Sequence, residues 1–574
     1  MKMKKQLFSM ILLLCCGLLA QAKIVNVDTA GTLKQYIPDD EKLTIDQLVV
    51  IGSLNGDDMR LIREMAGVDY NDNATTGKLA TLDLSQARIV AGGSSYKGSL
   101  MTKDNVVGES MFSKCTSLVT VKLPASVTSI ETDAFSDCSV MTSIELPNSL
   151  KTMGDAVFVN TGLVSITIPE GITRIGDFMF YYSVSLATVN FPTSLTEIGE
   201  EAFSGCPLTT INVAPGNRTF YTENGVLYTA DKTKLLLYPS GRVDDTFTMP
   251  AAVRTIGSAS CKEALFKNVV MNSGLTTIED YAFDGCTQLQ SIDMPSTVTK
   301  VGPFAFNKCT AVTSTTISTG LKSLPESMYA QCQNLNNVVV PDNVENIGVT
   351  AFSNCKSLSS ITLPARLDTL GDLVFNGCIA LTTVKLPEHV ASLGKGLFYS
   401  CKKLESVTMP IGIDSIPYRM FYGCYGLKEF EVPQGVTTIM MYAFQGAGLE
   451  KVTIPQSCTY IGDAAFMSCT QLAEIQNYNP TPQELGMFTF DQVPTSCVLY
   501  VPKGAAAAYR AADTWKEFTD TRERESTQVA SPVVVGSAVE VARYNAIGQR
   551  LQTPQCGVNI VVMSDGSIEK IVVR

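Results

Sequence analysis

Residues 355–378 read CKSLSSITLPARLDTLGDLVFNGC, and this segment contains one complete unit of a repeat. Ile361 and Leu363 alternate with polar residues, as in a strand with one buried and one exposed face. Pro364 cannot donate a hydrogen bond between strands, so it ends the strand. A second short apolar pair and Phe375 follow before the next unit begins. Each unit therefore predicts one principal strand and one turn back to the core.

The aromatic residue of this unit recurs along the chain. Successive intervals are 22 or 23 residues, except for one of 80. The positions are Phe112, Phe135, Phe158, Phe180, Phe203, Phe283, Phe306, Tyr329, Phe352, Phe375, Phe398, Phe421, Phe444 and Phe466. Such a period is typical of solenoids, in which no single unit buries its apolar residues alone. About fifteen stacked turns, which we call rungs, would form an array on the order of 70 Å long.

The repeat resembles a known family. Residues 347–364 contain the pattern Ile-Gly-x-x-x-Phe-x-x-Cys-x-x-Leu-x-x-Ile-x-Leu-Pro, which is similar to the leucine-rich repeat of BspA-like bacterial surface antigens. The resemblance extends over residues 106–475. It implies a β-rich solenoid of about 23 residues per repeat, and an exported protein associated with adhesion to host or matrix proteins and to other bacteria. Thr315 and Ser318 replace a core residue and the proline, which predicts a locally loose rung.

Regions outside the regular repeats have separate predicted roles. Residues 23–105 are expected to cap the N-terminal end of the core, and residues 476–525 to cap the other end, with Trp515 as an anchor. Residues 215–249, within the long interval, contain two strand-like runs that predict hairpins projecting from the array.

The first 22 residues have the pattern of a secretory signal. Three lysines precede an apolar run, and Ala20-Gln21-Ala22 supplies a small-x-small cleavage site, so the mature chain is expected to begin at Lys23. A lipoprotein signal that uses Cys15 or Cys16 is the alternative. No later stretch has the roughly 18 uninterrupted apolar residues of a transmembrane helix.

The last residues, 530–574, differ in composition from the repeats. They predict three or four short strands with an Asp565-Gly566 turn. The segment resembles the C-terminal sorting domain of the type IX secretion system, which implies passage across an outer membrane. A small β module that only caps or links is the alternative interpretation.

Cysteines follow the same register as the repeat. Seven of the 17 lie at intervals of 23 residues, and Thr161, Ser183 and Ala447 occupy the equivalent slot elsewhere. A disulfide needs Cβ atoms about 3.8 Å apart, closer than the strand spacing of about 4.8 Å. We therefore predict buried free thiols. Metal coordination is the alternative, but the sequence offers no CxxC pair or histidine partner. The seven are Cys286, Cys309, Cys332, Cys355, Cys378, Cys401 and Cys424.

Composition argues against catalysis and against nucleic-acid binding. The formal net charge is −11, which disfavours a polyanionic ligand. His389 is the single histidine, which excludes two-histidine metal sites and argues against acid–base and triad schemes. Glu429 and Glu431 share a strand face, but solvated strand residues explain them more simply than a glycosidase pair. We predict no enzyme activity, no catalytic residues, no metal site and no cofactor.

Tyrosines provide the most specific candidate for binding. The cluster consists of Tyr399, Tyr418, Tyr422, Tyr425 and Tyr442. Tyr399 and Tyr422 each follow the repeat phenylalanine on adjacent rungs, so they should lie one above the other. Tyrosine is enriched at recognition surfaces, although packing within the turns explains the cluster equally well. The leading hypothesis is a cell-surface or secreted protein that binds an extracellular protein or matrix ligand; a glycan-binding or nutrient-capture protein is the alternative.

Overall fold

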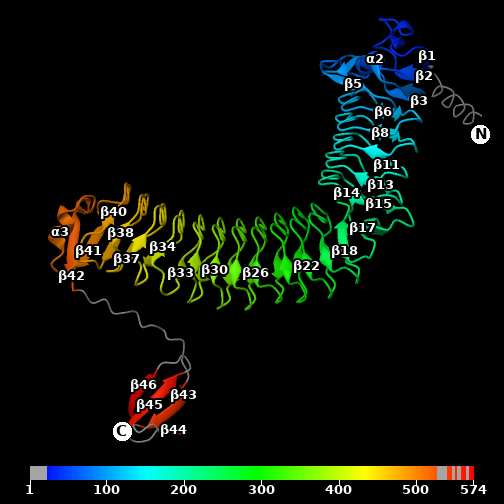
Figure 1. Cartoon of the computed structure of the whole chain (residues 1–574). Helices are drawn as coiled ribbons and strands as arrows, with labels where there is room; N and C mark the ends of the chain where they lie inside the picture. Colours follow the sequence, from blue (N-terminus) through cyan, green and yellow to red (C-terminus); the bar gives the residue numbers. More distant parts are fainter. Residues whose placement is uncertain (1–21, 526–539, 546–549, 552–556, 564–567, 574) are drawn as a thin grey trace, which may run out of the picture.

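The computed structural model describes residues 22–525, 540–545, 550–551, 557–563 and 568–573. It is a β-solenoid of about 22 turns with repeats of about 23 residues, drawn in Figure 1. The predicted fold class is confirmed, but about fifteen turns were expected. The number is larger because strands from both end regions, and from the long interval between Phe203 and Phe283, also stack as turns.

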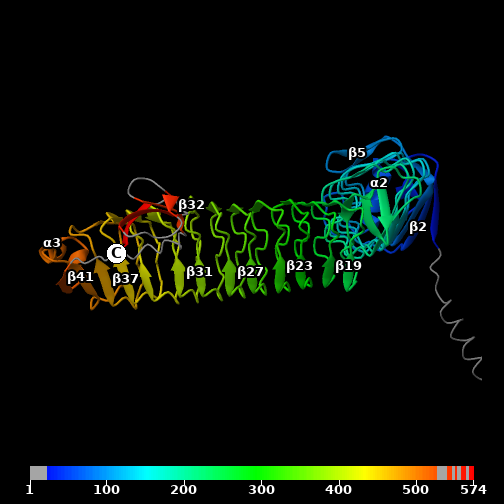
Figure 2. The ribbon, with the colours of Figure 1, turned by 90° about the horizontal axis from the view of Figure 1, so that it is seen from below.

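The principal strands form a parallel column along the solenoid. Polar and apolar residues alternate in them, so that in β31 Val384 is buried between two exposed neighbours. Figure 2 shows these strands side by side along the C-terminal arm. They are β1 (Lys23–Val27), β2 (Gln47–Leu54), β3 (Thr81–Ile89), β7 (Thr120–Lys122), β9 (Ser143–Glu145), β11 (Ser165–Thr167), β13 (Thr188–Phe191), β15 (Thr210–Val213), β19 (Thr246–Thr248), β21 (Asn268–Val270), β23 (Ser291–Asp293), β25 (Ser314–Thr316), β27 (Asn337–Val339), β29 (Ser360–Thr362), β31 (Thr383–Lys385), β33 (Ser406–Thr408), β35 (Glu429–Glu431), β37 (Lys451–Ile454), β39 (Glu474–Asn477), β41 (Val498–Pro502) and β42 (Asp520–Arg524).

A second column consists of two-residue strands, each with one inward apolar residue that precedes the repeat phenylalanine. These strands are also parallel, as in the pairing of Ile347 with Leu370. They are β6 (Val106–Val107), β8 (Ser129–Ile130), β10 (Thr152–Met153), β12 (Arg174–Ile175), β14 (Glu197–Ile198), β20 (Thr255–Ile256), β22 (Thr277–Ile278), β24 (Lys300–Val301), β26 (Ser323–Leu324), β28 (Asn346–Ile347), β30 (Thr369–Leu370), β32 (Ser392–Leu393), β34 (Ser415–Ile416), β36 (Thr438–Ile439), β38 (Tyr460–Ile461) and β40 (Glu484–Leu485).

The repeat phenylalanines form a stacked column inside the core. From Phe283 to Phe466 neighbouring ring centroids lie between 5.1 and 6.0 Å apart, and the planes are within 15° of parallel. Phe490 extends this column by one ring, at 5.4 Å from Phe466. Each such pair contributes about 0.5–1.5 kcal/mol beyond the burial of its area. The recurring aromatic residue thus stabilises the contact between rungs.

The array bends at the long interval, near β17 and β18 in Figure 1. Three antiparallel strands lie here: β16 (Phe220–Glu223), β17 (Val226–Thr229) and β18 (Lys234–Leu237). We expected hairpins that project, but β18 pairs in parallel with β20, and Tyr228, Leu235 and Tyr238 are buried. The segment therefore belongs to the core, because its apolar residues join the two arms.

The N-terminal end is covered by helix α2 (Gly56–Met65), with η1 (Leu33–Gln35) and the pair β4 (Gly92–Lys97) and β5 (Leu100–Thr102) beside it. The buried side chain of Arg63 on α2 donates through Nη1 to the carbonyl oxygens of Ser110 and Met111, both at 3.1 Å. It also forms an ion pair with Asp72 at 2.9 Å. These bonds satisfy carbonyl groups of the first phenylalanine turn, which has no preceding rung of its kind.

The C-terminal end is closed by α3 (Ala506–Ala511), η2 (Trp515–Glu517) and β42. Trp515 is buried, and its ring lies 5.1 Å from that of Phe490. Its Nε1 donates to the carbonyl oxygen of Gln483 at 3.2 Å. The predicted role of Trp515 as an anchor of this end is confirmed.

The last segment forms a four-stranded antiparallel sheet in the order β44-β43-β45-β46. The strands are β43 (Glu540–Asn545), β44 (Arg550–Leu551), β45 (Gly557–Met563) and β46 (Ile568–Val573). The expected small β module is therefore present. The predicted leader, residues 1–22, lies outside the described residues except for Ala22.

The rung with Thr315 and Ser318 is not loose, so this prediction was wrong. Ser318 is buried and donates to the carbonyl oxygen of Val298 at 2.7 Å. Thr315 lies within 2.9 Å of the hydroxyl of Tyr329. Hydrogen bonds here replace the apolar contacts of the other rungs.

Candidate functional site

The turns that carry the repeat aromatic residue are joined from rung to rung by a third column of backbone hydrogen bonds. The candidate tyrosines lie on these turns. Arg419 donates its backbone N–H to Met441 at 3.3 Å, and Phe421 donates to Ala443 at 2.8 Å. Residues two positions before and after the repeat aromatic residue have positive φ, as in Arg419 at 54° and Gly423 at 67°. The repetition of this turn superimposes equivalent side chains of adjacent rungs.

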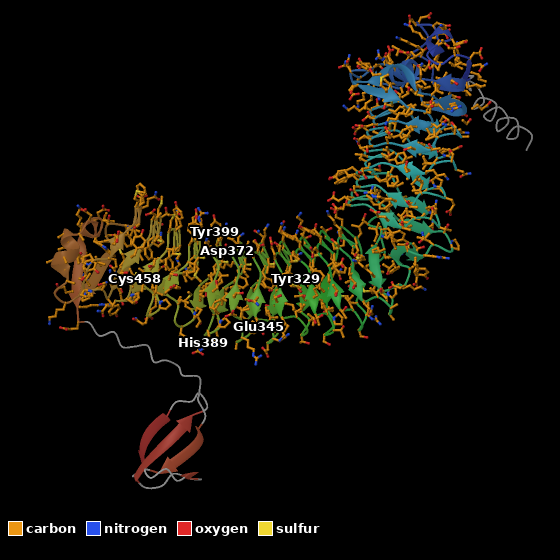
Figure 3. All side chains as sticks on the ribbon, viewed as in Figure 1. Tyr329, Glu345, Asp372, His389, Tyr399 and Cys458 are labelled. Atoms are coloured by element: carbon orange, nitrogen blue, oxygen red, sulfur yellow. The ribbon has the colours of Figure 1, made fainter. Side chains whose placement is uncertain are left out.

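Tyr399 and Tyr422 stack face to face. Their ring centroids are 4.6 Å apart and the planes differ by 6°, so the predicted arrangement is confirmed. Figure 3 shows Tyr399 on the edge of the arm that faces the inside of the bend, opposite His389 and Glu345. Both rings are half-buried, unlike the fully buried phenylalanines that precede them.

The other three predicted tyrosines divide into a pair and a separate residue. Tyr418 and Tyr442 meet edge to face, with centroids 5.9 Å apart. Tyr425 is 58% exposed. It lines a hollow of about 520 Å³ together with Tyr422, Lys428 and Gln445. Gly448 also borders this hollow. A Cβ atom there would lie 1.9 Å from the carbonyl oxygen of Tyr425, so only glycine fits.

Arg419 joins the two tyrosine pairs and was not identified from the sequence. Its Cζ lies 4.9 Å from the ring centroid of Tyr418, 5.1 Å from Tyr442 and 5.9 Å from Tyr422. Cation–π attraction therefore holds the guanidinium among three rings. A signal existed, because Arg419 stands two residues before Phe421, a position that this turn directs outward. We call Tyr399, Tyr418, Arg419, Tyr422 and Tyr442 the tyrosine patch.

The hydroxyl groups distinguish the patch from four buried tyrosines. Tyr96, Tyr238, Tyr329 and Tyr509 are buried, and each of their hydroxyls bonds to another group of the chain. No hydroxyl of the four patch tyrosines has such a bond among the residues that the structure describes. Met440 and Met441, beside Tyr442, are 41% and 37% exposed. The patch therefore presents aromatic and hydroxyl groups to solvent, and the two methionines add thioethers beside it.

Other exposed or half-buried aromatic residues lie on the same turns of other rungs. Phe178, Tyr181 and Tyr182 form a cluster in the N-terminal arm, and Tyr281 stacks on Phe304 at 4.9 Å. They were not predicted, because the sequence analysis followed only the cluster of five tyrosines between Tyr399 and Tyr442. Among the residues that the structure describes, no cation lies over the rings of either group.

The cysteine row consists of buried free thiols, as predicted. All 14 cysteines in the part of the chain that the structure describes are unpaired and buried. Most donate through Sγ to the carbonyl oxygen of the aromatic residue one rung earlier, as Cys355 does to Tyr329 at 3.2 Å. Ser183 makes the equivalent bond to Phe158 at 2.8 Å. The slot thus holds a small residue, and cysteine and serine add a donor to the rung before. Burial raises the pKa of the Cys378 thiol to about 12.

The structure offers little for acid–base or metal chemistry. Within residues 22–525 and the described tail strands, no three His, Cys, Asp or Glu side chains are placed to hold a metal ion. His389 is exposed. A hollow of about 660 Å³ near the bend has Glu263 as its one carboxylate and Lys308 as its one ammonium, so it lacks the carboxylate pair of a glycosidase. Among the described helices, none has the length and apolarity to span a membrane.

Comparison with known proteins identifies the repeat. The family model described as BspA type leucine rich repeat region matches in six copies, over residues 105–224, 254–382 and 346–473. The solved structure of a leucine-rich repeat protein from Eubacterium ventriosum is 29% identical, with a TM-score of 0.50; the match covers 57% of this chain and 84% of that one. A leucine-rich repeat protein from Bacteroides ovatus is 21% identical, with a TM-score of 0.42, over 75% of this chain and 89% of that one. No curated protein matches.

Proposed function

Because the chain belongs to the family of BspA-type leucine-rich repeat proteins, we propose that it is an exported surface protein whose solenoid binds another extracellular protein, as an adhesin does. Solenoids of this kind expose long surfaces without a deep cleft. The proposal therefore requires a surface whose chemistry suits a protein partner.

The composition of the tyrosine patch carries this proposal. Tyrosine, methionine and arginine are the residues enriched at protein–protein interfaces. Here four tyrosines and Arg419 lie together, with Met440 and Met441 exposed beside them. Stacked, half-buried rings are already fixed in position, so binding costs little side-chain entropy. The patch thus combines hot-spot residues with a rigid base.

Substitution of the stacked pair tests the proposal. Tyr399→Ala and Tyr422→Ala should each weaken binding to immobilised extracellular matrix proteins by about 1–3 kcal/mol, with a much smaller change in thermal unfolding. The matched control is Tyr281→Ala, because Tyr281 stacks on Phe304 at a turn far from the patch. Phe398→Ala is the control for loss of fold, since its ring is buried in the core column. Unchanged binding in both patch variants, with a large loss of stability, would contradict the proposal.

A glycan ligand is the second candidate, and the hollow beside the patch favours it. Tyr425 is exposed there among Lys428, Gln445 and Gln471, and an aromatic face with amide groups suits a sugar ring. Tyr425→Ala separates the two candidates. Loss of binding to a glycan array, with matrix-protein binding intact, would favour the glycan.

Export across an outer membrane is the remaining part of the proposal. The leader pattern in residues 1–22 and the antiparallel sheet β43–β46 support it. Deletion of residues 530–574 should leave the solenoid folded and abolish surface display. N-terminal sequencing should find Lys23 first; a lipid-modified Cys16 would show the lipoprotein route instead.

A further inference from the structure

We propose that Arg419 is the anchor for a carboxylate of the partner, supplied by an Asp or Glu side chain; this inference rests on the protein-binding function proposed above. The guanidinium lies among the rings of Tyr418, Tyr422 and Tyr442. These rings fix its direction at the edge of the turn column. The patch then presents a cation between two tyrosine pairs.

The charge of Arg419 is not compensated within the part of the chain that the structure describes. Its side chain makes no ion pair or hydrogen bond there, whereas Arg63, Arg174 and Arg242 each have a carboxylate partner. Its Nε atom is covered and has no acceptor. The Nη atoms of Arg419 are not covered in this way, so an incoming carboxylate would bind through them.

The fold does not require arginine at this position. The equivalent residues in other rungs are Gly396, Ser327 and Ala464, and all have the same positive φ. The turn is held by backbone hydrogen bonds and by the buried phenylalanine, not by the outward side chain. Arginine here is therefore free to serve binding.

The rung of Tyr399, which stacks on the rung of Tyr422, carries two further cations. Lys402 and Lys403, which follow Tyr399 on the same rung, are exposed and make no ion pair among the described residues. Arginine binds carboxylates through two parallel N–H donors, which fixes the partner's orientation as well as its charge. The tyrosine rings around it exclude water and strengthen this contact.

The test uses an array of short random-sequence peptides printed in matched pairs, in which each Asp or Glu of one member is replaced by Asn or Gln in its twin. The full-length protein should prefer acidic members, and Arg419→Gln should remove this preference with about a tenfold or greater loss of affinity for them. Arg419→Lys should retain part of the preference, because it keeps the charge but not the planar pair of donors. Arg366→Gln is the matched control, since Arg366 is exposed and outside the patch.

The outcomes separate this inference from the protein-binding proposal. If Tyr422→Ala loses all peptide binding while Arg419→Gln keeps the wild-type preference, the patch binds proteins but the carboxylate anchor is wrong. If both Tyr422→Ala and Tyr399→Ala bind as wild type does, the protein-binding proposal itself fails. A third outcome would also overturn the inference. In it, the protein binds no peptide of the array but binds acidic glycans, and Arg419→Gln abolishes the glycan binding. The carboxylate would then belong to a sugar.

Discussion

The hydroxyl of Tyr329 lies 2.9 Å from Oγ1 of Thr315, and each residue departs from the repeat at its own position. Tyr329 replaces the phenylalanine of the core column, and Thr315 replaces the buried aliphatic residue that Ile292 provides one rung earlier. A buried hydroxyl without a partner is costly. Each residue therefore supplies the hydrogen-bond partner that the other one needs inside the core.

This pairing predicts non-additive substitutions. Tyr329→Phe and Thr315→Val should each destabilise the array by about 1–2 kcal/mol, since each leaves a hydroxyl without its partner. The double variant restores the apolar contact of the other rungs and should be close to wild type. Urea unfolding of the four proteins measures the coupling.

Phe306→Tyr is the control for this cycle. Ile292 stands to Phe306 as Thr315 stands to Tyr329, so the new hydroxyl would be buried without a partner. The variant should destabilise the array by about 1–3 kcal/mol. Additive effects of Tyr329→Phe and Thr315→Val would show that the bond contributes nothing.

The core column was predictable from the sequence, but its extent was not. Phenylalanines at regular intervals identify a stack because each rung must bury one apolar side. In the rung of Cys261, cysteine occupies the aromatic slot, as its bond from Cys286 shows, so the sequence marks this rung only as a degenerate one, by Ile256 and Gly257. The bend was also unpredictable, because it depends on how β18 joins β20.

At the patch, the spacing predicted the stack of Tyr399 on Tyr422, whereas the contacts of Arg419 depend on side-chain directions that no period encodes.

The cysteine slot predicts that a donor matters more than sulfur. Cys355→Ser should be more stable than Cys355→Ala by about 1 kcal/mol, because Ser keeps a donor to the carbonyl of Tyr329. Ser183 already fills this slot and makes the bond. In the opposite direction, Ala447→Ser should stabilise its rung by supplying a donor to Phe421. Thermal unfolding of these three variants is the measurement, and equal stability of Cys355→Ser and Cys355→Ala would refute the role of the donor.

The C-terminal anchor predicts local loss of structure. Trp515→Ala removes a buried ring that contacts Phe490 and Tyr509, which should cost about 3–5 kcal/mol. In a repeat array each rung contacts only its neighbours, so the damage should begin at the end. Hydrogen exchange should accelerate in β41 and β42 and remain unchanged in β7–β15. Uniform acceleration along the chain would instead indicate one cooperative unit.

The buried thiols predict sensitivity to alkaline pH. The pKa of Cys378 is raised by burial from its usual 9.0 to about 12, and that of Cys115 likewise to about 12. Between these values the unfolded chain loses thiol protons that the folded chain retains, so the free energy of unfolding must fall as pH rises from about 9 to 12. Each thiol contributes a slope of at most about 1.4 kcal/mol per pH unit. Buried tyrosines add to this fall in the free energy of unfolding, so wild type must be compared with Cys378→Ser. The variant should show a shallower slope above pH 9 and the same slope at neutral pH. Parallel curves over the whole range would mean that the Cys378 thiol does not titrate with unfolding.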